Sequence, residues 1–232
     1  MALKPFSSHH RILSPFNFVD FTKLLTVTLT EDIEIEEIPK FVFASSALKE
    51  ITIPSSVNSI KQYAFYSCRS LSKVIIPKDS ALTEIKEYAF FGCRKLASIR
   101  LPKFIKSISR KCFASSGLRI IKLPKATKNV GEMAFYSCSK LSKITFNKRV
   151  NKLGKFAFAN NPLIESIDIP DSLKIINEYC FSNCYNLKQV NTTENTKLVE
   201  IHNGSFENTL IECLGVNCKA TKLFRPKGVP NL

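Results

Sequence analysis

The sequence predicts an α/β repeat protein, a solenoid of about eight copies with a parallel concave β-sheet and short helical turns. Three observations lead to this fold. A phenylalanine returns eight times at intervals of 22 to 25 residues, an aliphatic residue precedes each one by five positions, and a short alternating apolar frame follows most of them. A copy of this length cannot bury its apolar face alone, so consecutive copies must stack.

The repeating phenylalanine fixes the register of the copies. It occupies Phe43, Phe65, Phe90, Phe113, Phe135, Phe158, Phe181 and Phe206. The aliphatic residue five positions earlier is Ile38, Ile60, Ile85, Ile108, Val130, Leu153, Ile176 and Ile201. One ring per copy at strand spacing predicts a stacked spine of phenylalanines along the solenoid.

The frame after the phenylalanine reads Leu-x-x-Ile-x-Ile-Pro and alternates with period two, as in a half-buried strand. It predicts one strand per copy, at 50–53, 73–76, 98–101, 120–123, 143–146, 166–169 and 188–191. The stretch around each phenylalanine, such as 61–68, holds small and aromatic residues without Pro or Gly and predicts a helical turn. Each copy is therefore expected to contain one strand and one turn.

Three segments are expected along the chain. Residues 1–22 form an N-terminal extension, 23–218 the solenoid, and 219–232 a C-terminal tail. The first and last copies are atypical, since an acidic run precedes Ile38 and the last copy has lost its proline. We expect both to act as caps.

The repeat resembles the BspA-like class of leucine-rich repeats. The motif Ala-Phe-x-x-Cys-x-x-Leu-x-x-Ile-x-Ile-Pro is clearest at Ala64 to Pro77 and at Ala89 to Pro102. The resemblance implies a bacterial or protist surface protein that binds extracellular host or microbial components, often without enzymatic activity. It therefore implies the cell surface, whereas the lack of a recognisable signal peptide or membrane anchor favours the cytoplasm.

Catalysis and metal binding find little support among the residues. Six of eight cysteines fall in repeat columns and are expected to be core thiols, while Cys213 and Cys218 could alternatively pair near the C-terminal cap. The repeat region has one histidine, His202, and there is no glycine-rich phosphate loop and no apolar span long enough for a membrane. We therefore expect no enzyme activity, no cofactor and no metal.

The net charge of +15 is concentrated in the middle copies. Residues 61–160 hold 22 basic and 4 acidic residues, whereas the flanking segments are near neutral or slightly acidic. Strand alternation places Lys73, Arg100, Lys122 and Lys143 on the outward face of the sheet. A row that follows the strand-ending proline adds Lys78, Lys103, Lys125 and Lys148.

These eight residues are the predicted partner-binding site. An acidic protein or a polyanionic glycan is the expected partner, because neither outward column holds an aromatic residue that could stack on bases. Three alternatives stay open: a nucleic acid bound through its phosphates, an intracellular scaffold with an uncharged contact surface, and lysines that only keep the solenoid soluble.

Overall fold

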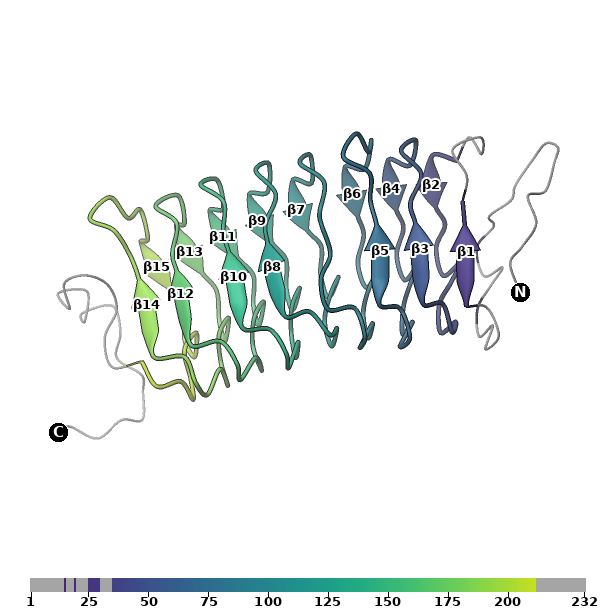
Figure 1. Ribbon diagram of the computed structural model, residues 1–232. Coiled ribbons are helices and arrows are strands. Elements are labelled where there is room, and N and C mark those ends of the chain that lie inside the picture. The colour runs from purple at the N-terminus through teal and green to yellow at the C-terminus, as the bar shows by residue number, and fades with distance from the viewer. Residues whose placement is uncertain (1–14, 16–18, 20–24, 30–34, 212–232) are drawn as a thin grey trace.

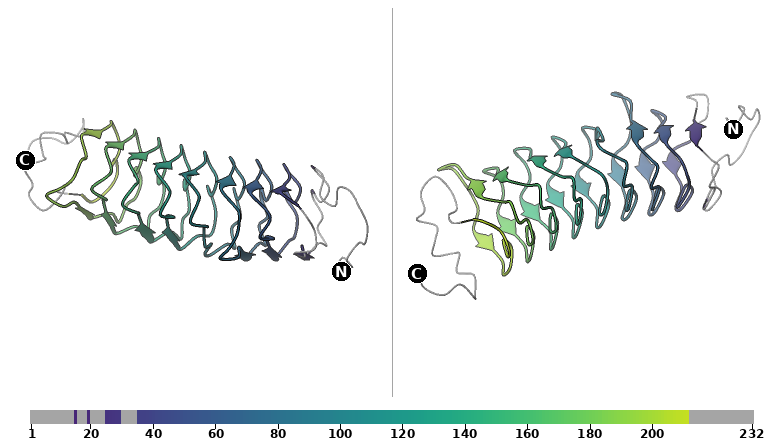
Figure 2. Two further views of the ribbon diagram at one scale, coloured as in Figure 1. Left: turned by 90° about the horizontal axis from the view of Figure 1, so that it is seen from above. Right: turned by 60° about the horizontal axis from the view of Figure 1, so that its bottom comes forward.

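The computed structural model describes Pro15, Val19 and residues 25–29 and 35–211. These residues form fifteen short strands and no helix, and the strands lie in two rows along an elongated solenoid of about seven turns (Figure 1). The view from above shows the two rows on opposite faces of the molecule (Figure 2). Cys213, Cys218 and the predicted C-terminal tail lie outside the described residues, as does the predicted N-terminal extension except for Pro15 and Val19.

The first row contains six of the seven predicted strands and one further strand, at Thr26–Thr28, that the sequence did not predict. Its members are β1 (Thr26–Thr28), β3 (Glu50–Thr52), β5 (Lys73–Ile75), β8 (Ile120–Lys122), β10 (Lys143–Thr145), β12 (Ser166–Asp168) and β14 (Gln189–Asn191). Pairing is parallel, and the central residue of each described triplet, such as Ile51 or Val74, is buried while its neighbours are not. This alternation confirms the orientation predicted from the sequence.

One predicted strand, 98–101, does not form. No backbone hydrogen bond joins these residues to the coil on either side, and Ile99 is only partly buried. The first row is consequently interrupted between β5 and β8, where Figure 1 shows a coil with a strand only in its rear row. A second break in its hydrogen bonding lies between β10 and β12, which belong to separate two-stranded sheets.

The second row was not expected as strands. Its members are β2 (Glu37–Ile38), β4 (Ser59–Ile60), β6 (Glu84–Ile85), β7 (Ser107–Ile108), β9 (Asn129–Val130), β11 (Lys152–Leu153), β13 (Ile175–Ile176) and β15 (Glu200–Ile201). Each two-residue strand ends on the aliphatic residue that precedes the repeating phenylalanine by five positions. The strands pair in parallel within two sheets, β2 to β6 and β7 to β15, and their aliphatic residues point into the same core as the first row.

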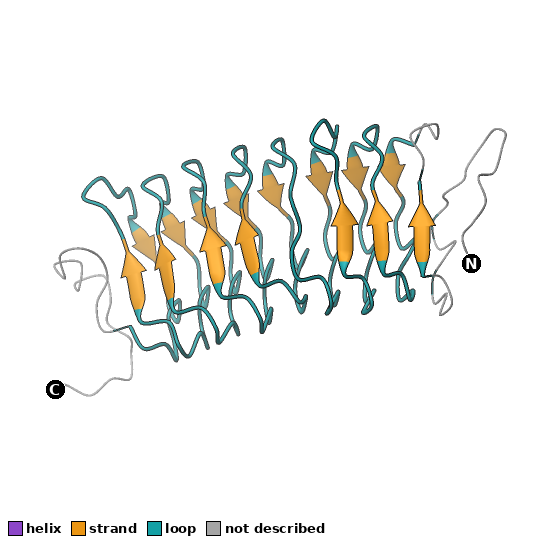
Figure 3. Cartoon of the chain, in the orientation of Figure 1, coloured by secondary structure: helices purple, strands orange, loops and turns teal. Residues whose placement is uncertain are grey.

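The segment around each phenylalanine is a pair of tight turns, and the helical turns that the sequence predicted are not formed among the described residues (Figure 3). Tyr63 and Ser67, two residues on either side of Phe65, have φ values of 59° and 54°, which a right-handed helix excludes. The Phe65 amide donates to the carbonyl of Ala89 in the next coil at 2.9 Å. Hydrogen bonds between coils thus alternate with bonds inside the turns, such as that from the Tyr66 amide to the Tyr63 carbonyl at 3.0 Å.

The predicted phenylalanine spine is confirmed. Seven consecutive ring pairs, from Phe43–Phe65 to Phe181–Phe206, have centroids 5.0–5.5 Å apart and interplanar angles of 1–15°. All eight rings are buried. Offset stacking of this kind adds about 0.5–1.5 kcal/mol per pair beyond the burial of apolar area, so the spine fixes the register between coils.

Candidate interaction surface

In the first-row strands from β3 to β14, the residues on either side of the buried central residue are exposed or partly exposed. Lys73, Lys122 and Lys143 are exposed on β5, β8 and β10, and Arg100 is exposed on the segment without a strand. Lys143 lies opposite Ile120 and Lys122 opposite Thr145 in the ladder. The two lysines are therefore diagonal neighbours, with Cα atoms about 8 Å apart by strand geometry.

The loops that follow the first-row strands carry the second predicted group. Lys78, Lys103 and Lys125 follow Pro77, Pro102 and Pro124, and Lys148 follows Asn147. All four lysines are exposed, in the loops that join the two rows at the top of Figure 1. Successive coils lie about 4.8 Å apart where their strands pair, so neighbouring lysines of this row are close in space.

Ion pairing separates one predicted residue from the other seven. The described part of the chain has five ion pairs, and Lys73 forms one of them with Glu50, with Nζ and Oε1 2.6 Å apart. The other seven predicted residues take part in none. Both members of the Lys73–Glu50 pair are largely exposed, so the pair contributes little stability. It does neutralise the charge at the N-terminal side of the predicted site.

Four further basic residues lie beside the predicted ones and were missed. They are Lys106, Lys128, Arg149 and Lys152, all exposed and all outside the five ion pairs. The Lys128 amide donates to the Lys106 carbonyl at 2.8 Å, which places these two residues side by side in adjacent coils. The recurrence of lysine four positions after Pro102 and Pro124 is the sequence signal that could have found them.

We call the three loops 102–109, 124–131 and 147–154 the basic edge. They hold seven Lys or Arg residues and no Asp or Glu. The loop before them contains Asp79 and Glu84, and the loop after them begins with Asp171. Arg100, Lys122 and Lys143 on the first-row side of this edge bring the total to ten exposed basic residues, which we call the basic surface; it runs from the first-row face over the edge to Lys152 on β11 of the second row.

The described cysteines are packed in the core, where their thiols are poorly suited to act as nucleophiles or metal ligands. Cys68, Cys93, Cys112, Cys138, Cys180 and Cys184 are free and buried. Burial raises the pKa of the Cys68 and Cys138 thiols to about 11 and that of Cys184 to about 12, because the thiolate would lose its hydration. Among the residues described, no three His, Cys, Asp or Glu side chains are grouped to hold a metal ion.

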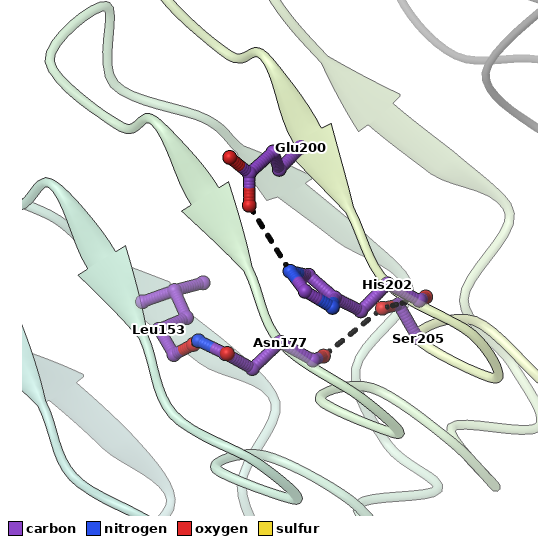
Figure 4. Close-up of polar contacts among 5 residues, drawn as sticks. All are labelled: Leu153, Asn177, Glu200, His202 and Ser205. Atoms are coloured by element: carbon purple, nitrogen blue, oxygen red, sulfur yellow. Dashed lines mark hydrogen bonds and ion pairs between the residues drawn. The ribbon is translucent and has the colours of Figure 1, made fainter.

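Polar residues meet at the C-terminal end of the second row, but they do not form a catalytic arrangement (Figure 4). His202 Nε2 lies 3.2 Å from Glu200 Oε2, and the Ser205 hydroxyl donates to the carbonyls of Asn177 and His202. The amide of Asn177 in turn donates to the Leu153 carbonyl at 2.6 Å. Since the serine does not contact the imidazole, the contacts of a base-activated nucleophile are not made.

Two rows of short parallel strands around a stacked spine define a leucine-rich repeat β-solenoid. The sequence profile described as "BspA type Leucine rich repeat region" matches residues 5–119 and 106–225, with six copies. The chain belongs to this family.

Solved structures agree with this assignment. A leucine-rich repeat protein from Bacteroides ovatus is 27% identical with a TM-score of 0.74, over 82% of this chain and 51% of that one. The pneumococcal vaccine antigen PcpA (23%, TM-score 0.53, 83% and 57%) and a Treponema pallidum leucine-rich repeat protein (24%, TM-score 0.54, 80% and 77%) share the fold. The chain thus spans little more than half the length of the first two. Comparison with curated proteins gave no match.

The described residues contain no helix of the length and apolar character needed to cross a membrane.

Proposed function

We propose that this chain is a non-enzymatic interaction module that binds an acidic protein or a polyanionic glycan through its exposed basic residues. The predicted residues Arg100, Lys122, Lys143, Lys103, Lys125 and Lys148 lie at the centre of the contact, with Lys73 and Lys78 at its N-terminal border. The observation that carries the proposal is the set of ten exposed cations on adjacent coils, none of which has an acidic ion-pair partner among the residues that the structure describes.

Electrostatics explains why such a surface favours a partner. Like charges crowded on neighbouring coils repel one another, and this repulsion is relieved when a polyanion binds. The same field accelerates encounter with an anionic partner and weakens as salt is added. Lysines whose sole task was solubility would be expected to alternate with acidic residues, as they do in the coils before β5 and after β12.

A role in adhesion or as a surface antigen is part of this proposal. It rests on membership of the BspA-type family and on likeness in fold to a bacterial vaccine antigen, which is an analogy at the level of the fold. Surface biotinylation of intact cells followed by fractionation tests it. Labelling of the chain on intact cells supports adhesion, whereas recovery only in the unlabelled cytosolic fraction supports an intracellular scaffold.

The binding proposal is tested with the double variant Arg100→Glu/Lys122→Glu. A matched control is Lys188→Glu/Lys197→Glu, which changes the net charge equally at two exposed lysines without ion-pair partners in the C-terminal coils. Binding to heparin, to a panel of acidic extracellular proteins and to oligonucleotides is measured at two salt concentrations. We expect the first variant to lose binding and the control to keep it.

Three outcomes would change the proposal. Equal binding by the Arg100→Glu/Lys122→Glu variant and the parent chain contradicts the basic site. Binding to single- or double-stranded oligonucleotides that persists near physiological salt, and exceeds binding to heparin and acidic proteins, favours a nucleic-acid partner. Partner capture that salt does not weaken favours an uncharged scaffold surface.

A further inference from the structure

Two large apolar side chains are exposed within the basic surface. Phe104 lies in the first loop of the basic edge and is 49% exposed, and Ile120 begins β8 and is 55% exposed. Single exposed apolar residues are common on protein surfaces. These two differ from the common case because both lie among cations that have no acidic partner.

The neighbouring coils leave both side chains uncovered. At the position of Phe104, the preceding and following loops carry Asp79 and Ala126, which are too small to shield a ring. Lys103 Nζ lies 4.7 Å from the centre of the Phe104 ring, so a cation is held against it. Ile120 is the only apolar residue in its outward column, whose other members are Glu50, Lys73, Ser98, Lys143, Ser166 and Gln189.

The cations lie between the two apolar side chains. Ile120 is at the start of its strand, and Lys122 and Lys125 follow it toward the loop edge. Arg100 precedes Phe104 in the adjacent coil. From the rise of a strand and the spacing of coils, Ile120 and Phe104 are about 15 Å apart. In an extended segment, side chains on one face that come closest to this separation are about four residues apart.

We infer that the partner recognised here is an extended acidic protein segment with two apolar side chains four residues apart, on one face of the segment, which seat on Phe104 and Ile120 while its carboxylates meet the cations between them. This inference rests on the proposed function and narrows its partner class. Heparin and nucleic-acid backbones supply charge but no aliphatic side chain for Ile120. A membrane surface could contact the loop edge that holds Phe104 but would not contact the strand face that holds Ile120.

The test uses the full chain and four synthetic probes. The first is a Glu/Asp peptide with two leucines four residues apart, so that both lie on one face when the peptide is extended. The second is the same peptide with serine in place of both leucines. Heparin and vesicles of phosphatidylcholine and phosphatidylserine are the third and fourth. The variant Phe104→Ser/Ile120→Thr leaves the charge unchanged, and Leu163→Ser, at a side chain that is 47% exposed outside the basic surface, is the matched control.

We expect the parent chain to bind the leucine peptide about tenfold more tightly than the serine peptide. Phe104→Ser/Ile120→Thr should abolish this difference and leave heparin binding unchanged, while Leu163→Ser should alter neither. Thermal melts of all variants check that the fold is retained. Arg100→Glu/Lys122→Glu should weaken binding of both peptides.

The outcomes separate this inference from the proposed function. Equal affinity of the parent chain for the two peptides, or tighter binding to heparin or vesicles that Phe104→Ser/Ile120→Thr does not change, overturns the inference and leaves a basic polyanion site intact. Unchanged binding of every probe by Arg100→Glu/Lys122→Glu overturns the proposed function itself.

Discussion

Truncation of one ring of the spine measures how far the fold depends on stacking. Phe135 is fully buried, and its ring centroid lies 5.5 Å from that of Phe113 and 5.1 Å from that of Phe158. Phe135→Ala removes a buried aromatic side chain, which costs about 3–5 kcal/mol. The loss of two stacked neighbours places the expected value in the upper part of this range.

Phe135→Leu separates stacking from burial. Leucine keeps most of the apolar volume and loses the two ring contacts, so we expect a cost of about 1–2 kcal/mol. Urea unfolding followed by far-UV circular dichroism gives the free energies. Because each coil contacts only its neighbours, Phe135→Ala should also reduce the dependence of the unfolding free energy on urea if the two halves of the solenoid uncouple.

The control is Phe104→Ala, which removes the same side chain from a half-exposed position. We expect it to change the unfolding free energy by less than about 0.5 kcal/mol. A cost for Phe135→Ala below about 1 kcal/mol, or one equal to that of Phe104→Ala, would refute the idea that the spine holds the coils in register.

Two further predictions concern the core and the close approach of coils. Burial holds the Cys138 thiol at a pKa of about 11, above its ordinary value of 9.0, so the folded state keeps a proton that the unfolded state loses as pH rises past 9. The protonated thiol therefore contributes fully to the free energy of unfolding below pH 9, and this contribution is lost as the pH rises through 11. The fall in unfolding free energy between pH 8 and pH 10 should shrink by about 1.4 kcal/mol in Cys138→Ala; an unchanged fall contradicts the assignment. A Cβ atom at Gly154 would lie 2.6 Å from the Gly131 carbonyl carbon, so Gly154→Ala should lower the unfolding free energy by about 1–3 kcal/mol. A melting temperature equal to that of the parent chain would contradict this prediction, because it would show that the two coils can move apart without loss of stability.

The repeat register predicted the spine and most first-row strands because each depends on inward residues that recur in every copy. The second row was not predicted because most of its strands, such as Glu84–Ile85, have only one buried residue, too few to show a period of two. The tight turns were mistaken for helical ones, although Gly92, Asn160 and Asn183, two positions after the phenylalanine, belong to the residue types that best tolerate positive φ.

Those features of the candidate site that depend only on the repeat register, meaning which residues share an outward column, could be predicted from the sequence. The pairing of Lys73 with Glu50 follows from their adjacency in one outward column, a cross-strand neighbour relation that the sequence already contains. The exposure of Phe104 depends on the sizes of Asp79 and Ala126 in the loops on either side, and so required the loops to be placed in three dimensions.

The alternation of buried and exposed positions explains how such a fold can acquire a binding surface. Ile121 and Ile144 fill the core beneath β8 and β10, while the outward residues on the same strands, such as Lys122 and Lys143, make no ion pair within the described chain. Outward residues can therefore change with little effect on the spine, since distant and unshared contacts contribute additively to stability. The rigid stacking of Phe113, Phe135 and Phe158 beneath them holds the cations at the coil spacing, so less conformational entropy is lost when a partner binds.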